Sequence, residues 1–461
     1  MEYISTRNIK NFFSFKDVFL KGLAPDGGLF IPKFITPYTS NELSKLKSFS
    51  YNELATEIIF KFSKDTFNKK EIEDLVNDSY KDFRVQDVVK INKLEKINLL
   101  ELFHGPTLAF KDIAMQVIGN MYEKILKKNN LKINIIVATS GDTGAAAISA
   151  IKDRENIKIF VLHPKNKISD VQRKFMTTTN SKNVFNIALD GNFDDCQKLV
   201  KEMFADSKFN SSINMSGVNS INWSRIVMQI VYYFFSYFKI AKKWEKINFS
   251  VPTGNFGDIY AGYIAKKMGL PISKLIIATN KNDILKRVVN SGLYKPLKVE
   301  QTISPSMDIQ ISSNFERLMF DVCLGNAARV VDLMKALKEK GEFKLKKDEL
   351  NIINENFNSE SLSEKETNLA IKEMYNDHKI LIDPHSAIGV GVLKKIPLKE
   401  TVITLATAHP AKFSNAILNA TGVQPELPEK VKNIMTKEEI YKNLPNDLKK
   451  IQNFILEKAK T

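Results

Sequence analysis

Cysteine is almost missing from this sequence. Its 461 residues include only Cys196 and Cys323, which lie far apart and form no CxxC pair. Neither a disulfide framework nor a thiolate metal site is therefore indicated, and we expect no bound metal. Such a composition is typical of a reducing compartment, so we predict a cytoplasmic protein.

Long apolar runs are absent as well. The start of the sequence lacks the charged-then-apolar profile of a secretory signal. The most apolar stretch, residues 225–241, is too short and too polar to span a membrane comfortably. We predict that this stretch forms a buried helix and that the protein has no membrane partner.

Lysine, in contrast, is abundant. Lys and Arg outnumber Asp and Glu by 68 to 52, which gives a formal net charge of +16. The lysines are dispersed along the chain, and dispersed lysine favours a solvated surface over a nucleic-acid interface. We therefore predict that the protein binds no nucleic acid. Its positive field still helps to collect a small anionic substrate.

Short runs rich in isoleucine and valine recur along the chain and predict an α/β fold. Most of them are followed by a helical pattern. Strands of this kind are buried on both faces, which indicates parallel sheets covered by helices. The runs cover residues 132–138, 158–164, 184–189, 247–252, 274–279 and 401–407.

The length of the chain allows several domains. A glycine-rich turn at residues 24–32, followed by charged helical patterns, indicates an N-terminal domain over residues 1–95. We assign residues 96–435 to a main region of two α/β subdomains with a ligand site between them. Within that region, the polar segment 335–380 shows little strand signal and is predicted to form surface helices. Residues 436–461 are predicted to form a helical C-terminal end.

Two loops between a predicted strand and a predicted helix have the composition of anion sites. The first is TSGDTG, residues 139–144, and the second is TGNFG, residues 253–257. Glycines let the backbone approach a ligand closely, and the free N–H groups of a helix start attract a carboxylate or phosphate. The same residue types also cap helices, and for either loop alone capping is the commoner explanation. Neither loop contains GxGxxG or GxxxxGK[ST], so we do not expect a nucleotide. Two such loops at strand ends predict one crevice between them.

Lys111 lies in the first turn of a predicted helix. From Phe110, apolar residues recur with helical spacing as far as Ile125. A cation at this point opposes the helix dipole, so the field and partial desolvation lower the pKa of the amine. A lowered pKa suits an amine that is a nucleophile and later a base. The alternative is a lysine that extends along the helix edge to solvent, and composition does not decide between the two.

A series of motifs, in contrast, resembles the threonine synthase family over nearly the whole chain. The matching stretches are YISTRN, PDGGLFIP, ELFHGPTLAFKD, ATSGDTGAAA, SINWSRI, VPTGNFGD, IIATNKND and TAHPAKF. Members of this family are pyridoxal 5'-phosphate (PLP) enzymes of the tryptophan-synthase-β fold type, fold type II. The resemblance implies that PLP is the cofactor and that residues 96–435 are the catalytic region.

The resemblance also implies roles at the cofactor. Lys111 matches the catalytic lysine that bonds covalently to PLP. Thr407 matches the hydroxyl residue that faces the pyridine nitrogen, which differs from PLP enzymes that use an Asp or Arg there. Asp142 matches a position near the ring hydroxyl where several relatives have Asn, so its protonation state is open. The loop that holds the cofactor phosphate corresponds to Gly254, Asn255, Phe256 and Gly257.

The reaction implied for the family converts O-phospho-L-homoserine and water into L-threonine and phosphate, through γ-elimination and β-addition of water. Ser140 and Thr143 are implied to bind the substrate carboxylate. Arg225 and Lys412 are the cations inside matched motifs that we predict to bind the substrate phosphate, for which the planar fork of arginine is suited. For Arg225, pairing with a neighbouring carboxylate is the alternative. We expect a monomer or a homodimer.

Other functions fit parts of the same pattern. A threonine-synthase-like phospholyase that stops at a keto acid, or a hydroxy-amino-acid dehydratase, keeps the lysine and the glycine loop, so product analysis must separate them. A non-catalytic basic binding protein on a degenerate enzyme fold is the alternative from another class. The argument against a non-catalytic protein is that every position assigned a chemical role above holds a residue able to perform that role. The histidines in matched stretches, including His385, receive no chemical role.

Overall fold

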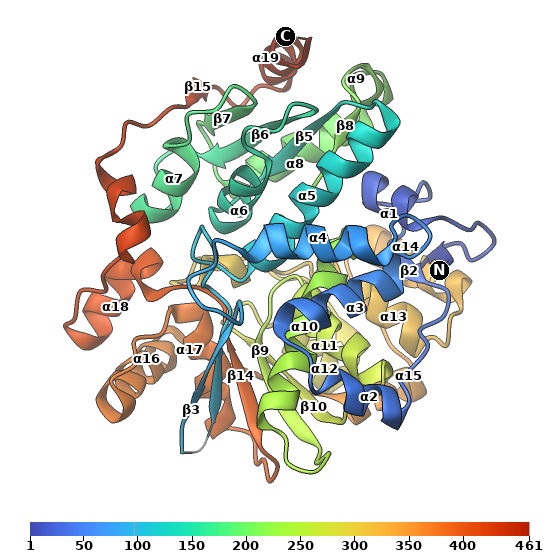
Figure 1. Cartoon of the computed structure of the whole chain (residues 1–461), viewed down its shortest axis with the longest axis vertical. Coiled ribbons are helices and arrows are strands. Elements are labelled where there is room, and N and C mark those ends of the chain that lie inside the picture. Colours follow the sequence, from blue (N-terminus) through green and yellow to red (C-terminus); the bar gives the residue numbers. More distant parts are fainter. Residues whose placement is uncertain (96, 461) are drawn as a thin grey trace.

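Two parallel sheets, one above the other in Figure 1, organise the computed structural model, which describes residues 1–95 and 97–460. The larger sheet has six strands, and its neighbours run parallel except at the β3–β4 edge. In spatial order the strands are β13 (Phe357–Ser361), β10 (Ile272–Thr279), β9 (Ile247–Pro252), β14 (Val402–Ala406), β4 (Asn98–Glu101) and β3 (Lys90–Lys93).

The second sheet has five strands, all paired in parallel. In spatial order they are β15 (Lys442–Leu444), β7 (Val184–Leu189), β6 (Ile157–Pro164), β5 (Ile133–Ala138) and β8 (Met215–Ser216). Each of the six predicted isoleucine-rich and valine-rich runs forms a strand of one of the two sheets, which confirms the α/β prediction.

Five strands of the two sheets, β3, β4, β8, β13 and β15, were not predicted, and the last two lie where we predicted helices. β13, with the sequence FNSES, lies in the segment for which we predicted surface helices, and β15 lies in the predicted helical end. Both are short, and their side chains are largely polar or partly exposed, so neither shows the apolar run by which a buried strand is found. They are held as strands by backbone pairing with β10 and β7.

The N-terminal residues add helices to the same hydrophobic core. They form β1 (Tyr3–Ser5), α1 (Phe15–Lys21), β2 (Phe30–Pro32), α2 (Ser40–Leu46), α3 (Tyr51–Ser63) and α4 (Lys69–Tyr80). Each of these four helices begins with a capping box, which fixes where it starts. Their apolar faces pack into one cluster with buried residues from later parts of the chain, including α5 (Lys111–Asn129) and α10 (Trp223–Ile240). The edge strand β3 falls inside the range predicted for this domain, but it pairs with β4.

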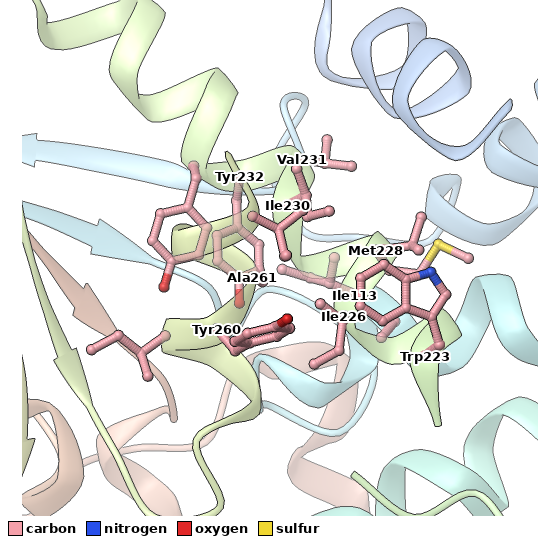
Figure 2. Close-up of a cluster of buried hydrophobic side chains, with 14 of the residues drawn as sticks. Ile113, Trp223, Ile226, Met228, Ile230, Val231, Tyr232, Tyr260 and Ala261 are labelled. Atoms are coloured by element: carbon pink, nitrogen blue, oxygen red, sulfur yellow. The ribbon is translucent and has the colours of Figure 1, made fainter. Parts of the chain in front are cut away.

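Helix α10 (Trp223–Ile240) is the centre of that core. Nearly all of its side chains are buried, which confirms the buried helix predicted for residues 225–241. Figure 2 shows Trp223 and Ile226 of α10 in the same cluster as Tyr260 of α11 (Gly257–Lys267). Across the described residues, no helix combines the length and apolarity needed to cross a bilayer.

The remaining helices cover the sheets and connect their strands. On and around the five-stranded sheet lie α5 (Lys111–Asn129), α6 (Asp142–Ile151), α7 (Asp170–Thr177), α8 (Phe193–Ala205), α9 (Ser207–Ser212) and α19 (Leu448–Lys460). The later part of the chain contributes α12 (Ile284–Ser291), β11 (Leu293–Tyr294), η1 (Pro305–Met307), α13 (Phe315–Val322), α14 (Ala327–Lys340), β12 (Phe343–Lys344), α15 (Lys347–Asn356), α16 (Glu364–His378), α17 (Pro384–Gly391), η2 (Val392–Lys394), η3 (Pro410–Phe413), α18 (Ser414–Thr421) and η4 (Glu429–Thr436).

Candidate active site

One pocket of about 600 Å³ opens where strands of both sheets end. The loops after β5 and β9 both line it, as the single crevice predicted from the sequence requires. Of the eleven predicted site residues, ten line this pocket: Lys111, Ser140, Asp142, Thr143, Arg225, Gly254, Asn255, Phe256, Gly257 and Thr407. Lys412 does not.

Backbone pairing brings Lys111 and Thr407 together. The chain that leaves β14 runs beside the segment that leads into α5, and the Phe110 N–H donates to the Thr407 carbonyl at 2.9 Å. The His409 N–H donates to the Leu108 carbonyl at 3.0 Å. Helix α5 then begins at Lys111, as the sequence predicted.

The amine of Lys111 lies among charged groups. Its Nζ is 3.5 Å from Asp142 Oδ2 and 4.5 Å from the centre of the Phe110 ring. Burial lowers the pKa of the amine, while the charge of Asp142 partly opposes this shift. The positive charges of Arg225 and Lys412 lower that pKa further. The sequence predicted a lowered pKa, and the direction is confirmed, with burial as its largest cause.

Asp142 is ionised. Burial alone would raise the pKa of this carboxyl group, but the charges of Lys412 and Lys111 hold it well below its ordinary value. Lys412 Nζ lies 2.7 Å from Asp142 Oδ1, and Gln172 Nε2 donates to the same oxygen at 2.8 Å. The ion pair with Lys412 and the lowered pKa both favour the carboxylate form of Asp142, which can only accept hydrogen bonds.

Lys412 lies behind Asp142, away from the pocket. Its side chain is 1% exposed, and besides Asp142 it donates to the Thr107 carbonyl at 2.7 Å. Two of the three N–H donors of this ammonium are thus used inside the protein. The contacts of Lys412 are those of a counter-ion for Asp142, and its binding to a substrate phosphate stays a prediction.

The 253–257 loop has the geometry of an anion cradle. Helix α11 begins after Phe256, whose backbone is left-handed (φ 66°), and no side chain in the described part of the chain caps this helix start. Its first N–H groups are thus left for a ligand. A Cβ added at Gly254 would meet the Ser306 carbonyl oxygen at 2.9 Å, so the loop packs too closely for any larger residue. These features favour a cradle over a simple cap.

The 139–144 loop is partly capped. Thr139 Oγ1 accepts from the N–H groups of Gly141 and Gly144 at 3.0 and 2.9 Å. The capping explanation therefore holds for this threonine. Ser140 and Thr143 instead line the pocket and bring hydroxyl groups to the start of α6.

Arg225 has an unused donor in the pocket wall. Its guanidinium is buried, and its Nε has no hydrogen-bond partner among the described residues. Within the described part of the chain, the guanidinium makes one hydrogen bond, a long one from Nη1 to the Val218 carbonyl at 3.4 Å. Burial lowers the pKa of Arg225 to about 10, so the group stays charged at neutral pH. Among the described residues no carboxylate forms a direct ion pair with Arg225, and Asp258 acts on its pKa only through its charge.

Sequence reasoning missed Asp258, which follows the cradle directly and lines the same pocket. Tyr232 and Tyr233 of α10 donate to its Oδ1, at 2.5 and 3.0 Å, while its Oδ2 is buried without a partner among the described residues. Burial raises the pKa of Asp258 to about 6, against the hydrogen bonds from both tyrosines. In the sequence, the one signal for a role of Asp258 is its position directly after a glycine loop. The tyrosines that surround its carboxyl group belong to α10 and are distant in the sequence.

The raised pKa of Asp258 predicts a pH-dependent stability. The folded state binds the proton more tightly than the unfolded chain, whose carboxyl has its ordinary pKa of 3.8. This stabilisation is complete below pH 3.8 and is lost as the pH rises through about 6. Asp258→Asn keeps an acceptor for the tyrosines and does not titrate. As the pH rises from 4.5 to 7.5, the free energy of unfolding of the Asp258→Asn variant should rise relative to that of the wild type, by on the order of 1–3 kcal/mol. Urea unfolding at both pH values measures this difference, and an equal difference at both would contradict it.

These residues fit PLP. A buried lysine with a lowered pKa can bond to an aldehyde, and an uncapped helix start can hold a phosphate in the same pocket. The unpaired Nε of Arg225 leaves a cation for a second anion. The pocket therefore has a place for a phosphorylated aldehyde cofactor and for an anionic substrate beside it.

Three family models match the chain in sequence. Residues 2–80 match the threonine synthase N terminus, and residues 86–338 match the pyridoxal-phosphate-dependent enzymes. Residues 386–455 match the C-terminal region of threonine synthase. Threonine synthase of Pseudomonas aeruginosa is 42% identical over 459 residues, which cover 99% of this chain and 98% of that protein. The chain belongs to the threonine synthase family.

Other threonine synthases are similar to this chain over nearly its whole length. The protein of Saccharomyces cerevisiae is 41% identical, with 94% of this chain and 93% of that protein covered. Among solved structures, PLP-bound threonine synthase from Brucella melitensis superposes with a TM-score of 0.96 at 43% identity, over 100% of both chains. The N-terminal domain and fold type II are thereby confirmed, and membership of the threonine synthase family makes the protein a PLP-dependent lyase.

Proposed function

We propose that the protein is a threonine synthase, which converts O-phospho-L-homoserine and water into L-threonine and phosphate. The observation that carries this proposal is the pocket itself. It joins one buried lysine of lowered pKa to an uncapped helix start and to an arginine with a free donor. A PLP enzyme acting on a phosphorylated amino acid needs these three features together.

The pocket supports a set of cofactor contacts. Lys111 would hold the cofactor through its amine, and Thr407 would be the partner of the ring nitrogen. Asp142, as a carboxylate, accepts a hydrogen bond near the ring hydroxyl. The phosphate is held by the loop Gly254, Asn255, Phe256 and Gly257. Phe256 contributes only its backbone, because its ring is buried against Phe315 with 5.4 Å between ring centres.

The substrate lies between the two loops. Ser140 and Thr143 bind its carboxylate with hydroxyl groups at the start of α6. Arg225 binds its phosphate, a role supported by the partnerless Nε in the pocket wall. Burial of Arg225 strengthens its electrostatic contact with the phosphate.

Lys111 moves the protons of the reaction. When bound, PLP supplies an electron-accepting ring that makes the Cα and Cβ protons of the substrate acidic. The free amine of Lys111 removes those protons, and it is poised to do so because burial and neighbouring cations lower its pKa. Arg225 stabilises the departing phosphate at Cγ. After protonation at Cγ, the hydroxyl group of water adds at Cβ and a proton returns to Cα, which gives threonine.

We further propose that the protein acts in the cytoplasm as a monomer or homodimer, without a nucleic-acid partner. Two free, buried cysteines fit a reducing compartment. The dispersed lysines fit a solvated surface.

A phospholyase or a dehydratase on the same fold is the alternative. The family also holds a relative named threonine synthase-like 2, from Xenopus laevis, which is 35% identical over 95% of this chain. A substrate panel separates the functions. We expect turnover of O-phospho-L-homoserine and no keto acid from L-serine or L-threonine. Rapid keto-acid release from either hydroxy amino acid would support the dehydratase instead.

The role of Arg225 predicts a specific loss. Arg225→Lys should lower kcat/KM for O-phospho-L-homoserine by at least about tenfold, because a lysine cannot replace a bidentate contact to phosphate. The visible absorption of the bound cofactor should not change. A variant that keeps full activity at low substrate concentration would place the phosphate ligand elsewhere, and one that loses cofactor and stability together would make Arg225 a structural residue.

A further inference from the structure

Asp383, the N-cap of helix α17, is a buried carboxylate that holds two neighbouring side chains. It is 0% exposed. Its Oδ2 lies 2.6 Å from His385 Nδ1 and accepts from the His385 N–H at 3.0 Å. Its Oδ1 accepts from the Ser386 N–H at 3.1 Å and from the Ser386 hydroxyl. Both oxygens are thus used, and each orients a different side chain.

The first branch leads to the phosphate cradle. Because Asp383 faces His385 Nδ1, that nitrogen carries the proton and Nε2 is left as an acceptor. Nε2 accepts from the Ser306 N–H at 3.2 Å. The Ser306 carbonyl lies against Gly254, as the 2.9 Å approach of an added Cβ shows. His385 therefore fixes the turn η1 that packs on the cradle.

The segment that contains Ser306 makes further hydrogen bonds to the cradle at its other end. Ser312 Oγ donates to the Gly254 carbonyl at 2.7 Å, and the Asn314 N–H donates to the Asn255 carbonyl at 3.0 Å. Residues 304–314 thus form a strap over the 253–257 loop. The strap is held by its own hydrogen bonds at one end and by His385 at the other.

The second branch leads to the other end of the cofactor site. Ser386 Oγ donates to Asp383 and accepts from the Thr407 N–H at 3.0 Å. The Thr407 carbonyl in turn accepts from the N–H of Phe110, the residue before Lys111. Ser386 therefore fixes the backbone that carries the Thr407 hydroxyl.

We propose that Asp383, His385 and Ser386 form a positioning unit that aligns both ends of the bound cofactor. His385 sets the phosphate end through the strap, and Ser386 sets the ring-nitrogen end through Thr407. The inference rests on the proposed cofactor contacts, and it adds residues to which neither the sequence nor the pocket chemistry gave a role. Both series of contacts start from the buried carboxylate of Asp383. The distance between the phosphate end and the ring-nitrogen end of the cofactor site is therefore held constant.

The two branches can be tested separately with two probes, PLP and pyridoxal, which lacks the phosphate. The measurement is the dissociation constant of each probe for the apoprotein, with folding checked by circular dichroism. His385→Ala should weaken PLP binding about tenfold and leave pyridoxal binding nearly unchanged, since one hydrogen bond to the strap is lost. His385→Gln, whose side-chain oxygen can accept from Ser306, should recover part of the loss. Ser386→Ala should weaken both probes by a similar factor.

Two matched variants control for loss of buried volume. His163 on β6 is as buried as His385 and does not line the pocket, and Ser236 of α10 is buried and donates to carbonyls of its own helix. His163→Ala and Ser236→Ala should leave both dissociation constants unchanged. If His385→Ala lowers the affinity for PLP and pyridoxal equally, or no more than His163→Ala does, the positioning unit is wrong. If the wild type binds neither probe, the proposed cofactor site itself is wrong.

Discussion

Replacing Lys111 with alanine is expected to lower kcat for O-phospho-L-homoserine by about a thousandfold, as for the loss of an acid–base group. The variant should keep its fold. Asp142 retains Lys412 at 2.7 Å, so removing the Lys111 amine leaves no uncompensated buried charge. The amine is the only basic group that the mechanism places at the substrate, so no neighbour should replace it. Steady-state kinetics with saturating PLP measure the loss.

A lysine outside the pocket gives the control for this prediction. Lys274 of β10 donates to backbone carbonyls and does not line the pocket, so Lys274→Ala should keep kcat within about twofold. In the wild type, borohydride reduction followed by peptide mapping should place the cofactor label on Lys111. Label on another lysine, or substantial turnover by Lys111→Ala, would contradict the assignment.

The second large effect is expected at the buried pair of Asp142 and Lys412. Lys412→Met should destabilise the protein by on the order of 3 kcal/mol, because Asp142 loses its nearest cation in the interior. The double variant Asp142→Asn, Lys412→Met should recover most of this loss, since an amide carries no charge to compensate. The free energies of unfolding of the wild type, both single variants and the double variant form a complete cycle.

A partly exposed ion pair gives the comparison for this cycle. Lys267 contacts Asp321 at 2.5 Å with about a third of its side chain exposed, and Lys267→Met should cost less than about 1 kcal/mol. If Lys412→Met costs no more than that, or if the double variant is as unstable as Lys412→Met alone, Lys412 is not the counter-ion of Asp142. The double variant should still bind PLP, because Asn can also accept a hydrogen bond near the ring hydroxyl.

The sequence predicted those features that depend on a single short segment of the chain. The start of α5 at Lys111 followed from local apolar spacing, and six strands of the two sheets followed from their isoleucine-rich and valine-rich runs. At the 253–257 loop the sequence left anion binding and helix capping open, and the structure shows no side-chain cap there among the described residues, which favours anion binding. In each case the evidence lies within about twenty residues of chain.

Where partners lie far apart in the sequence, prediction from the sequence was weak. Lys412 was assigned to substrate because it is a cation in a matched motif. Its burial against Asp142 depends on a contact across 270 positions of the chain. The raised pKa of Asp258 depends on tyrosines of α10, and the role inferred for His385 depends on Ser306. Strand β13 carries almost no apolar signal and exists through its pairing with β10.

The central claim is that the protein completes the conversion to threonine rather than stopping after phosphate loss. The most direct measurement is a single incubation of the PLP-loaded protein with O-phospho-L-homoserine, in which phosphate, L-threonine and keto acid are quantified together. The account predicts threonine and phosphate in equal molar amounts and no keto acid. Phosphate accompanied by an equal amount of keto acid, or no phosphate at all, would contradict it.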